Sequence, residues 1–101
     1  MYGTIARFHI KPGVKGDFIK TMDSFGDADI AGWAADYYFQ MDNDPHEFYL
    51  VAIFKDKETY QANADSTEQH ERYLVFRSFL TDDPEWHDGF ILSATGPGSG
   101  T

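Results

Sequence analysis

The sequence places an imidazole, a phenol and a guanidinium along one predicted helix. His70, Tyr73 and Arg77 recur with Leu74 at the spacing of a single helical face. An imidazole exchanges protons near neutral pH, a phenol can donate to an oxyanion, and a guanidinium can hold an enolate or a carboxylate. If this face looks onto a sheet, the three groups converge on the gap between helix and sheet. His70, Tyr73 and Arg77 are therefore the candidate catalytic residues.

A purely structural interpretation fits the same three residues. His70 would then lie half-buried in the first helical turn, Tyr73 would pack against the core, and Arg77 would pair with a surface acid. The opposite side of the helix is expected to be apolar, at Val75, Phe76 and Phe79. The sequence leaves both interpretations open.

Aromatic side chains are abundant enough to line a pocket for a flat ligand. They make up 17% of the chain, and the candidate substrate-binding residues are Phe8, Trp33, Tyr37, Tyr38 and Trp86. The competing interpretation is core packing, because aromatic residues in strands usually belong to the core.

No metal or cofactor site is expected. The chain has no cysteine, and no two of its histidines stand at a helical ligand spacing. A glycine-rich phosphate loop is also missing, since Gly96 and Gly98 lie in the expected tail rather than between a strand and a helix.

Strand and helix periods alternate along the chain. Strands are expected at residues 4–10, 33–41, 47–54 and 86–94, and helices at 14–25, 56–63 and 67–80. Asp56 is a predicted helix N-cap, and Ser66 with Gln69 fits a capping box. The order strand, helix, strand, strand, helix, strand predicts an α+β, ferredoxin-like fold, with a four-stranded antiparallel sheet and its helices on one face.

The strand at 47–54 is apolar on both of its sides. Phe48, Leu50 and Phe54 alternate with Tyr49 and Val51, so neither face of this strand is suited to water. Helices on one face would leave the other as a large exposed apolar patch. We therefore expect a homodimer that packs sheet face against sheet face.

Length and charge limit the classes of function. The chain has 101 residues, which suits one domain, expected at 1–95 and followed by a flexible tail at 96–101. A net charge of −9 repels phosphate backbones and anionic lipid, so nucleic acid and membranes are not expected partners. A cytoplasmic location is expected, because the first residues do not resemble a signal peptide.

Several segments together resemble a known family. The strand at 48–54, the Lys-Asp-Lys-Glu-Thr-Tyr stretch at 55–60, the Ser-Thr-Glu-Gln-His helix start at 66–70 and the Asp-Pro-Glu-Trp-His-Asp stretch at 83–88 are similar to antibiotic biosynthesis monooxygenase (ABM) domains. The resemblance covers residues 1–94, almost the whole chain.

The resemblance implies a dimeric α+β barrel. The family includes cofactor-independent oxygenases of polycyclic phenols and quinols, and also haem-degrading monooxygenases. Where the haem-degrading branch has Asn and Trp, this sequence has Ala6 and Asn63, and only His70 corresponds. The expected function is therefore a cofactor-independent monooxygenase acting on an aromatic or quinone-type small molecule. The alternative is a non-catalytic small-molecule-binding or sensing dimer, with haem binding less favoured.

Overall fold

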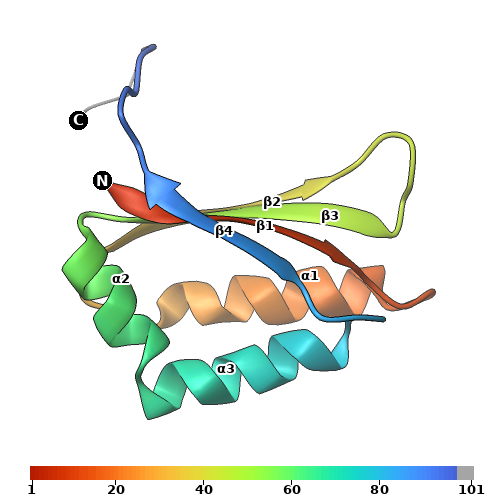
Figure 1. Cartoon of the computed structure of the whole chain (residues 1–101). Coiled ribbons are helices and arrows are strands. Elements are labelled where there is room, and N and C mark those ends of the chain that lie inside the picture. Colours follow the sequence, from red (N-terminus) through yellow and green to blue (C-terminus); the bar gives the residue numbers. More distant parts are fainter. Residues whose placement is uncertain (98–101) are drawn as a thin grey trace.

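An antiparallel sheet with helices packed on one face forms the fold (Figure 1). A computed structural model describes residues 1–97. The elements in chain order are β1 (Tyr2–His9), α1 (Lys15–Ser24), the short helix η1 (Phe25–Asp27), β2 (Trp33–Gln40), β3 (Glu47–Phe54), α2 (Lys57–Ala64), α3 (Thr67–Ser78) and β4 (Glu85–Phe90).

The strand order confirms the predicted α+β, ferredoxin-like fold. The strands lie side by side as β2-β3-β1-β4, and every neighbouring pair is antiparallel. Among residues 1–97, no helix is long and apolar enough to cross a membrane. The predicted tail at 96–101 falls largely on residues 98–101, outside the described residues.

The last strand is shorter than predicted. β4 ends at Phe90 rather than Ala94, because its partner β1 begins at Tyr2, the residue that pairs with Phe90. One further hydrogen bond, from the Ile91 N–H to the Met1 carbonyl, closes the ladder.

Two side-chain caps fix the helices that follow β3, as predicted. The Asp56 carboxylate accepts a hydrogen bond from the Thr59 N–H at 2.8 Å, and the Ser66 hydroxyl accepts one from the Gln69 N–H at 3.1 Å. The second cap, ten residues after the first, starts a new helix at Thr67 and so limits α2 to eight residues, Lys57–Ala64. The two short helices meet at an angle (Figure 1).

The core lies between the sheet and the helices, toward the end where α1 and α3 meet. Phe18 of α1 is fully buried and its ring contacts Phe8, Phe48 and Phe76. These rings lie at centroid distances of 5.7–6.1 Å from Phe18, within the range of favourable aromatic packing.

α3 does not have the two faces that the sequence predicts. Its buried side carries Phe76, with Tyr73 packed partly against the core, whereas Leu74 and Val75 are 53% and 41% exposed. The helix is therefore rotated from the expected orientation, and its core stripe passes through Phe76.

An irregularity in β2 changes which residues share a sheet face. Trp33 pairs with Phe54 and Ala35 with Ile53, so the register shifts at Ala34. The extra residue brings Trp33 onto the helix-covered face with Asp36, although simple alternation predicts opposite faces.

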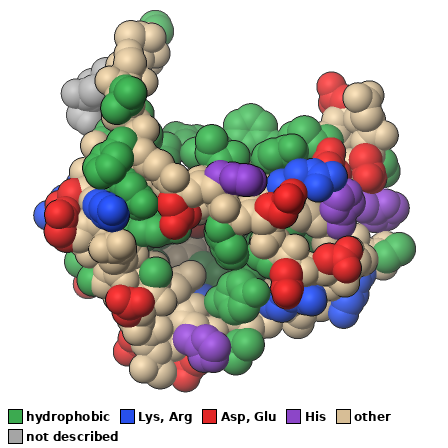
Figure 2. Space-filling model, viewed as in Figure 1, with side chains coloured by type: hydrophobic (Ala, Val, Ile, Leu, Met, Phe, Trp, Pro, Cys, Tyr) green, Lys and Arg blue, Asp and Glu red, His purple; other side chains and the backbone are tan. Residues whose placement is uncertain are grey.

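The other face of the sheet carries no helix in the described residues. Ile5, Tyr37 and Phe39 are 51–55% exposed there, beside half-buried Tyr49 and Val51. Figure 2 shows this as a band of hydrophobic side chains along the uncovered side of the sheet. The expectation that both sheet faces are apolar is met on β3.

Gly3 provides a stability test of the β1–β3 contact. A Cβ at Gly3 would lie 2.0 Å from the Ala52 carbonyl oxygen, whereas one at Gly16 in α1 meets nothing within 4 Å. We expect Gly3→Ala to lower the free energy of unfolding by about 2 kcal/mol or more, because the two strands must separate. Gly16→Ala should be neutral or stabilising by up to about 1 kcal/mol. Urea unfolding of both variants measures the difference, and equal effects would contradict it.

Candidate functional site

A cavity of about 930 Å³ lies between the sheet and the helices. It is lined by residues of all the strands, of α2 and α3, and of the end of α1 with the segment that follows it. Figure 2 shows a hollow on this side of the molecule, below the sheet. Its volume is in the range of pockets that enclose drug-sized molecules.

The floor of the cavity is a cross-strand row of small and polar residues. Asp36 pairs with Ala52, Ala52 with Thr4, and Thr4 with Asp88, so these four residues cross the sheet from edge to edge. The two central members are small, which leaves room beneath the helices. Both ends of the row carry a carboxylate.

Aromatic side chains form the walls. The row on one side of the floor begins with Trp33 and Phe54, and the row on the other side begins with Tyr38 and ends with Trp86. Tyr73 of α3 joins Trp86 at a ring-centroid distance of 6.4 Å. Walls of this kind suit a flat, apolar ligand.

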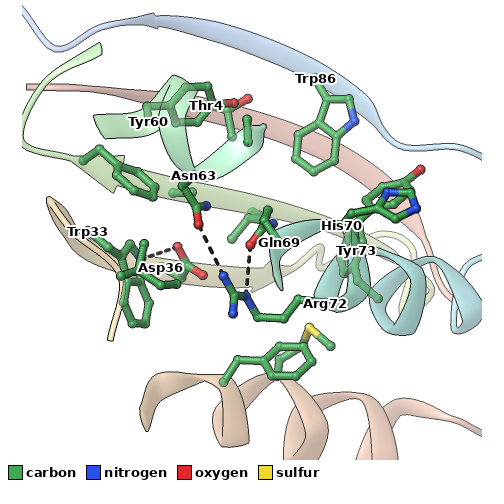
Figure 3. Close-up of a pocket in the computed structure, with 18 of the residues that line it drawn as sticks. Thr4, Trp33, Asp36, Tyr60, Asn63, Gln69, His70, Arg72, Tyr73 and Trp86 are labelled. Carbon is green, nitrogen blue, oxygen red and sulfur yellow. Dashed lines mark hydrogen bonds between the residues drawn. The ribbon is translucent and has the colours of Figure 1, made fainter. Parts of the chain in front are cut away.

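A half-buried guanidinium projects into the cavity from α3. Arg72 donates from Nε to the Gln69 side-chain oxygen at 3.1 Å and from Nη2 to the Asn63 side-chain oxygen at 3.3 Å (Figure 3). Within residues 1–97, no carboxylate lies within 4.0 Å of its nitrogens. Its charge is therefore oriented by neutral amides and is not neutralised by a contact ion pair.

The cap of α3 explains why Gln69 can hold Arg72. In a full capping box the Gln69 side chain would reach back to the Ser66 N–H. Here that N–H donates to the Asn63 carbonyl at 3.0 Å. The side chain of Gln69 is consequently free to accept from Arg72, and the α2–α3 junction positions both amides.

Asp36 faces the cavity from β2. Its carboxylate accepts a hydrogen bond from the Trp33 indole N–H at 2.9 Å. The Asp36 side chain is accessible from the cavity, yet neighbouring protein atoms exclude part of the water around its carboxyl. This desolvation raises the pKa of the Asp36 carboxyl, and the indole hydrogen bond, which lowers it, offsets only part of the rise. Desolvation also raises the pKa of the neighbouring Tyr38 phenol, with a further contribution from the Asp36 carboxylate.

A second polar group lies where α2 approaches β4. The Tyr60 hydroxyl donates to the Asp88 carboxylate at 3.0 Å. Burial is the largest cause that raises the pKa of Tyr60, to about 12, and the hydrogen bond to Asp88 is the second. Tyr60 therefore remains a neutral donor at physiological pH.

Two of the three predicted catalytic residues line the cavity. His70 and Tyr73 do so, with His70 exposed in the first turn of α3. Arg77 does not, because two helical turns carry it past the cavity, where it donates to the Asp83 carboxylate at 2.8 Å and to the Leu80 carbonyl at 3.2 Å. For Arg77 the geometry matches the structural alternative, a pair with a surface acid.

The predicted substrate-binding residues also divide. Trp33, Tyr38 and Trp86 line the cavity. Phe8 is only 2% exposed and belongs to the core, and Tyr37 points to the uncovered sheet face, so neither reaches the cavity. Within the described part of the chain, no group of three potential ligands among His, Asp and Glu is arranged to hold a metal ion.

The model of the antibiotic biosynthesis monooxygenase family matches residues 1–79. The chain belongs to the ABM family. A search of curated proteins finds no match.

Solved structures agree with this assignment at the level of the fold. A variant of SnoaB, a cofactor-independent oxygenase from Streptomyces nogalater, superposes with a TM-score of 0.76 at 11% identity, covering 92% of this chain and 94% of that chain. A conserved protein from Methanosarcina mazei Go1 gives 0.74 at 16% identity, covering 87% and 89%. An antibiotic biosynthesis monooxygenase gives 0.73 at 14% identity, covering 92% and 100%.

Sequence reasoning missed several of the polar residues that line this cavity, Arg72 among them. Arg72 follows the helical face of Gln69 and Phe76 at intervals of three and four residues, a signal that was present in the sequence. The Asp36–Ala52–Thr4–Asp88 row carried no such signal, because it depends on strand register.

The raised pKa of Asp36 gives a test of the cavity environment. A carboxyl whose pKa is higher in the folded than in the unfolded state costs stability once pH rises above the unfolded value. We therefore expect Asp36→Asn to raise Tm at pH 7, by about 2–4 °C for a domain of this size, and the gain to vanish near pH 3. Thermal unfolding monitored by circular dichroism at both pH values measures it.

The control is Asp42→Asn, which removes the same charge from the exposed β2–β3 turn. It separates the cavity effect from the general relief of the negative net charge. An Asp36→Asn variant that is less stable than the wild type at pH 7 would contradict the prediction.

Proposed function

We propose that this ABM protein is a cofactor-independent monooxygenase that oxidises an anionic aromatic small molecule of the phenol or quinol type. The observation that carries the proposal is the Arg72 guanidinium in an aromatic cavity, oriented by Asn63 and Gln69 and without a contact carboxylate in the described residues. Such a group is suited to stabilise a phenolate or enolate oxygen.

The reaction needs no electron donor other than the substrate. Loss of the phenolic proton gives an electron-rich anion that can reduce O2. One oxygen atom then becomes the new carbonyl of a quinone. The other leaves as water with the phenolic proton and the displaced ring hydrogen. The similarity of fold to SnoaB, a cofactor-independent oxygenase, supports this class of reaction.

His70 is the proposed proton acceptor. It lies at the cavity lining from the same helix as Arg72 and is exposed, so it can pass a proton to solvent. An imidazole suits this task near neutral pH. In this proposal Arg72 stabilises the anion, and Tyr73 with Trp86 contacts the ring system.

A non-catalytic binding or sensing role is the second candidate. The same cavity would hold an aromatic anion without oxidising it, and Arg72 would serve affinity alone. The two candidates differ in one measurement, because binding without oxygen uptake raises Tm but consumes no O2.

Arg72 and Arg77 form a matched pair for testing the proposal. Both lie on α3, but only Arg72 lines the cavity. We expect Arg72→Gln to raise the Kd for naphthoate about 10- to 100-fold, the equivalent of losing a charge-assisted hydrogen bond, and Arg77→Gln to leave it unchanged. Isothermal titration calorimetry measures both. Equal effects of the two substitutions would contradict the assignment.

Oxygen uptake with a panel of polycyclic phenols completes this test. His70→Ala should retain naphthoate binding and lose at least tenfold in rate, as expected for removal of a general base. Unchanged turnover would remove His70 from the mechanism. Binding of the phenols by the wild type without oxygen uptake would favour the sensing role.

We also propose that two copies associate through the uncovered sheet face. The apolar side chains of Ile5, Tyr37, Phe39 and Val51 lie there together, and the family resemblance implies the same arrangement. Ligand cavity and dimer contact would then use opposite faces of one sheet.

A charge placed on this face should separate the dimer. Val51 lies between Ile5 and Tyr37 across the sheet, so in Val51→Glu a carboxylate would be buried in the contact, at a cost of several kcal/mol. We expect sedimentation velocity to show a dimeric wild type and a monomeric variant. The control is Leu74→Glu, at an exposed position of α3, and this variant should remain dimeric. A monomeric wild type or a dimeric Val51→Glu variant would contradict the proposal.

A further inference from the structure

The side chain of Thr4 has a buried hydroxyl that forms no hydrogen bond within the described residues. The residue lies in the middle of the cavity floor on β1 and is only 4% exposed. Its Oγ1 has no hydrogen-bond partner among residues 1–97. A buried unpaired hydroxyl costs about 1–3 kcal/mol, and valine, which has the same shape, would avoid that cost. The hydroxyl therefore calls for a partner that the folded chain does not supply.

The neighbouring polar groups do not supply that partner. The Tyr60 hydroxyl directs its proton to Asp88. A side-chain contact with Thr4 offsets part of the rise in the Tyr60 pKa, but the two hydroxyls do not lie in hydrogen-bonding geometry. The Thr4 hydroxyl thus lies at the cavity floor without a hydrogen-bond partner among residues 1–97.

Charge limits what can bind beside Thr4. Asp36 and Asp88 stand at the two ends of its row, and their carboxylates oppose a second anionic oxygen. Arg72, with Asn63 and Gln69, approaches from the helices, whereas Thr4 and Tyr60 lie together by the sheet (Figure 3). The sheet side of the cavity therefore holds two carboxylates, whereas the Arg72 guanidinium lies on the helix side, which Asp23 and Asp65 also line.

We propose that Thr4 is a specificity residue that donates a hydrogen bond to a neutral oxygen of the substrate, a carbonyl or hydroxyl remote from the anionic oxygen at Arg72. The inference rests on the proposed function and narrows its substrate class. The substrate is then a polycyclic aromatic with one ionised oxygen and one neutral oxygen at separate positions, as in a hydroxyquinone.

Two naphthoates and three Thr4 side chains test the inference. The first probe is a hydroxynaphthoate with its carboxylate and hydroxyl on opposite rings, and the second is unsubstituted naphthoate. The wild type should bind the hydroxylated probe more tightly than unsubstituted naphthoate. Thr4→Val should raise the Kd of the hydroxylated probe about three- to tenfold and so abolish that preference. Thr4→Ser, which keeps the hydroxyl, should retain the preference. Calorimetric titration gives each Kd.

The stability of the unliganded protein provides a second readout. Because the Thr4 hydroxyl is unpaired, Thr4→Val should fold with a Tm equal to or above that of the wild type. A clear drop in Tm would mean that the hydroxyl has a structural partner, and would overturn the inference.

The outcomes separate this inference from the proposed function. If Arg72→Gln weakens both probes but Thr4→Val weakens both equally or neither, the Thr4 inference fails and the anionic site stands. If the wild type binds neither probe, both fail. Loss of only the hydroxyl preference in Thr4→Val supports the inference.

Discussion

The cavity depends on a lack of side-chain volume in one row of the sheet. Between two rows rich in large side chains, β3 contributes Ala52 and β1 contributes Thr4. Protein interiors are close-packed, so helices laid over two bulky rows and one small row enclose a space above the small one. The aromatic cluster around Phe18 fills the interior at one end. The space is left at the end where α2 and α3 meet the sheet.

The α2–α3 junction adds chemistry to that space. Asp56 and Ser66 cap two helices so close in sequence that the chain must turn sharply between them. The turn satisfies the Ser66 N–H with the Asn63 carbonyl and leaves the amide side chains of Asn63 and Gln69 for Arg72. A carboxylate in their place would neutralise the arginine. Two neutral acceptors orient it and leave its charge for a ligand, because a guanidinium has five N–H donors and uses only some of them here.

The sequence predicted what depends on local pattern and missed what depends on register or rotation. Alternation in β3 and the caps at Asp56 and Ser66 are properties of neighbouring residues, and the structure confirms them. The rotation of α3 about its axis is set by the packing of Phe76 against Phe8, a contact between residues far apart in the chain. The sequence therefore favoured Arg77 over Arg72, although both are arginines of one helix.

The irregularity in β2 shows why such errors concentrate near the cavity. One extra residue at Ala34 transfers Trp33 from the uncovered face to the helix-covered face, where its indole N–H reaches Asp36. A regular strand would place that indole among Tyr37 and Phe39, enlarging the uncovered apolar face and leaving the Asp36 carboxylate without this donor. From Ala35 to Gln40, strict alternation places each residue of β2 on the correct face of the sheet. The departure from regular pairing gives the cavity both an aromatic wall and a hydrogen bond to one of its two floor carboxylates.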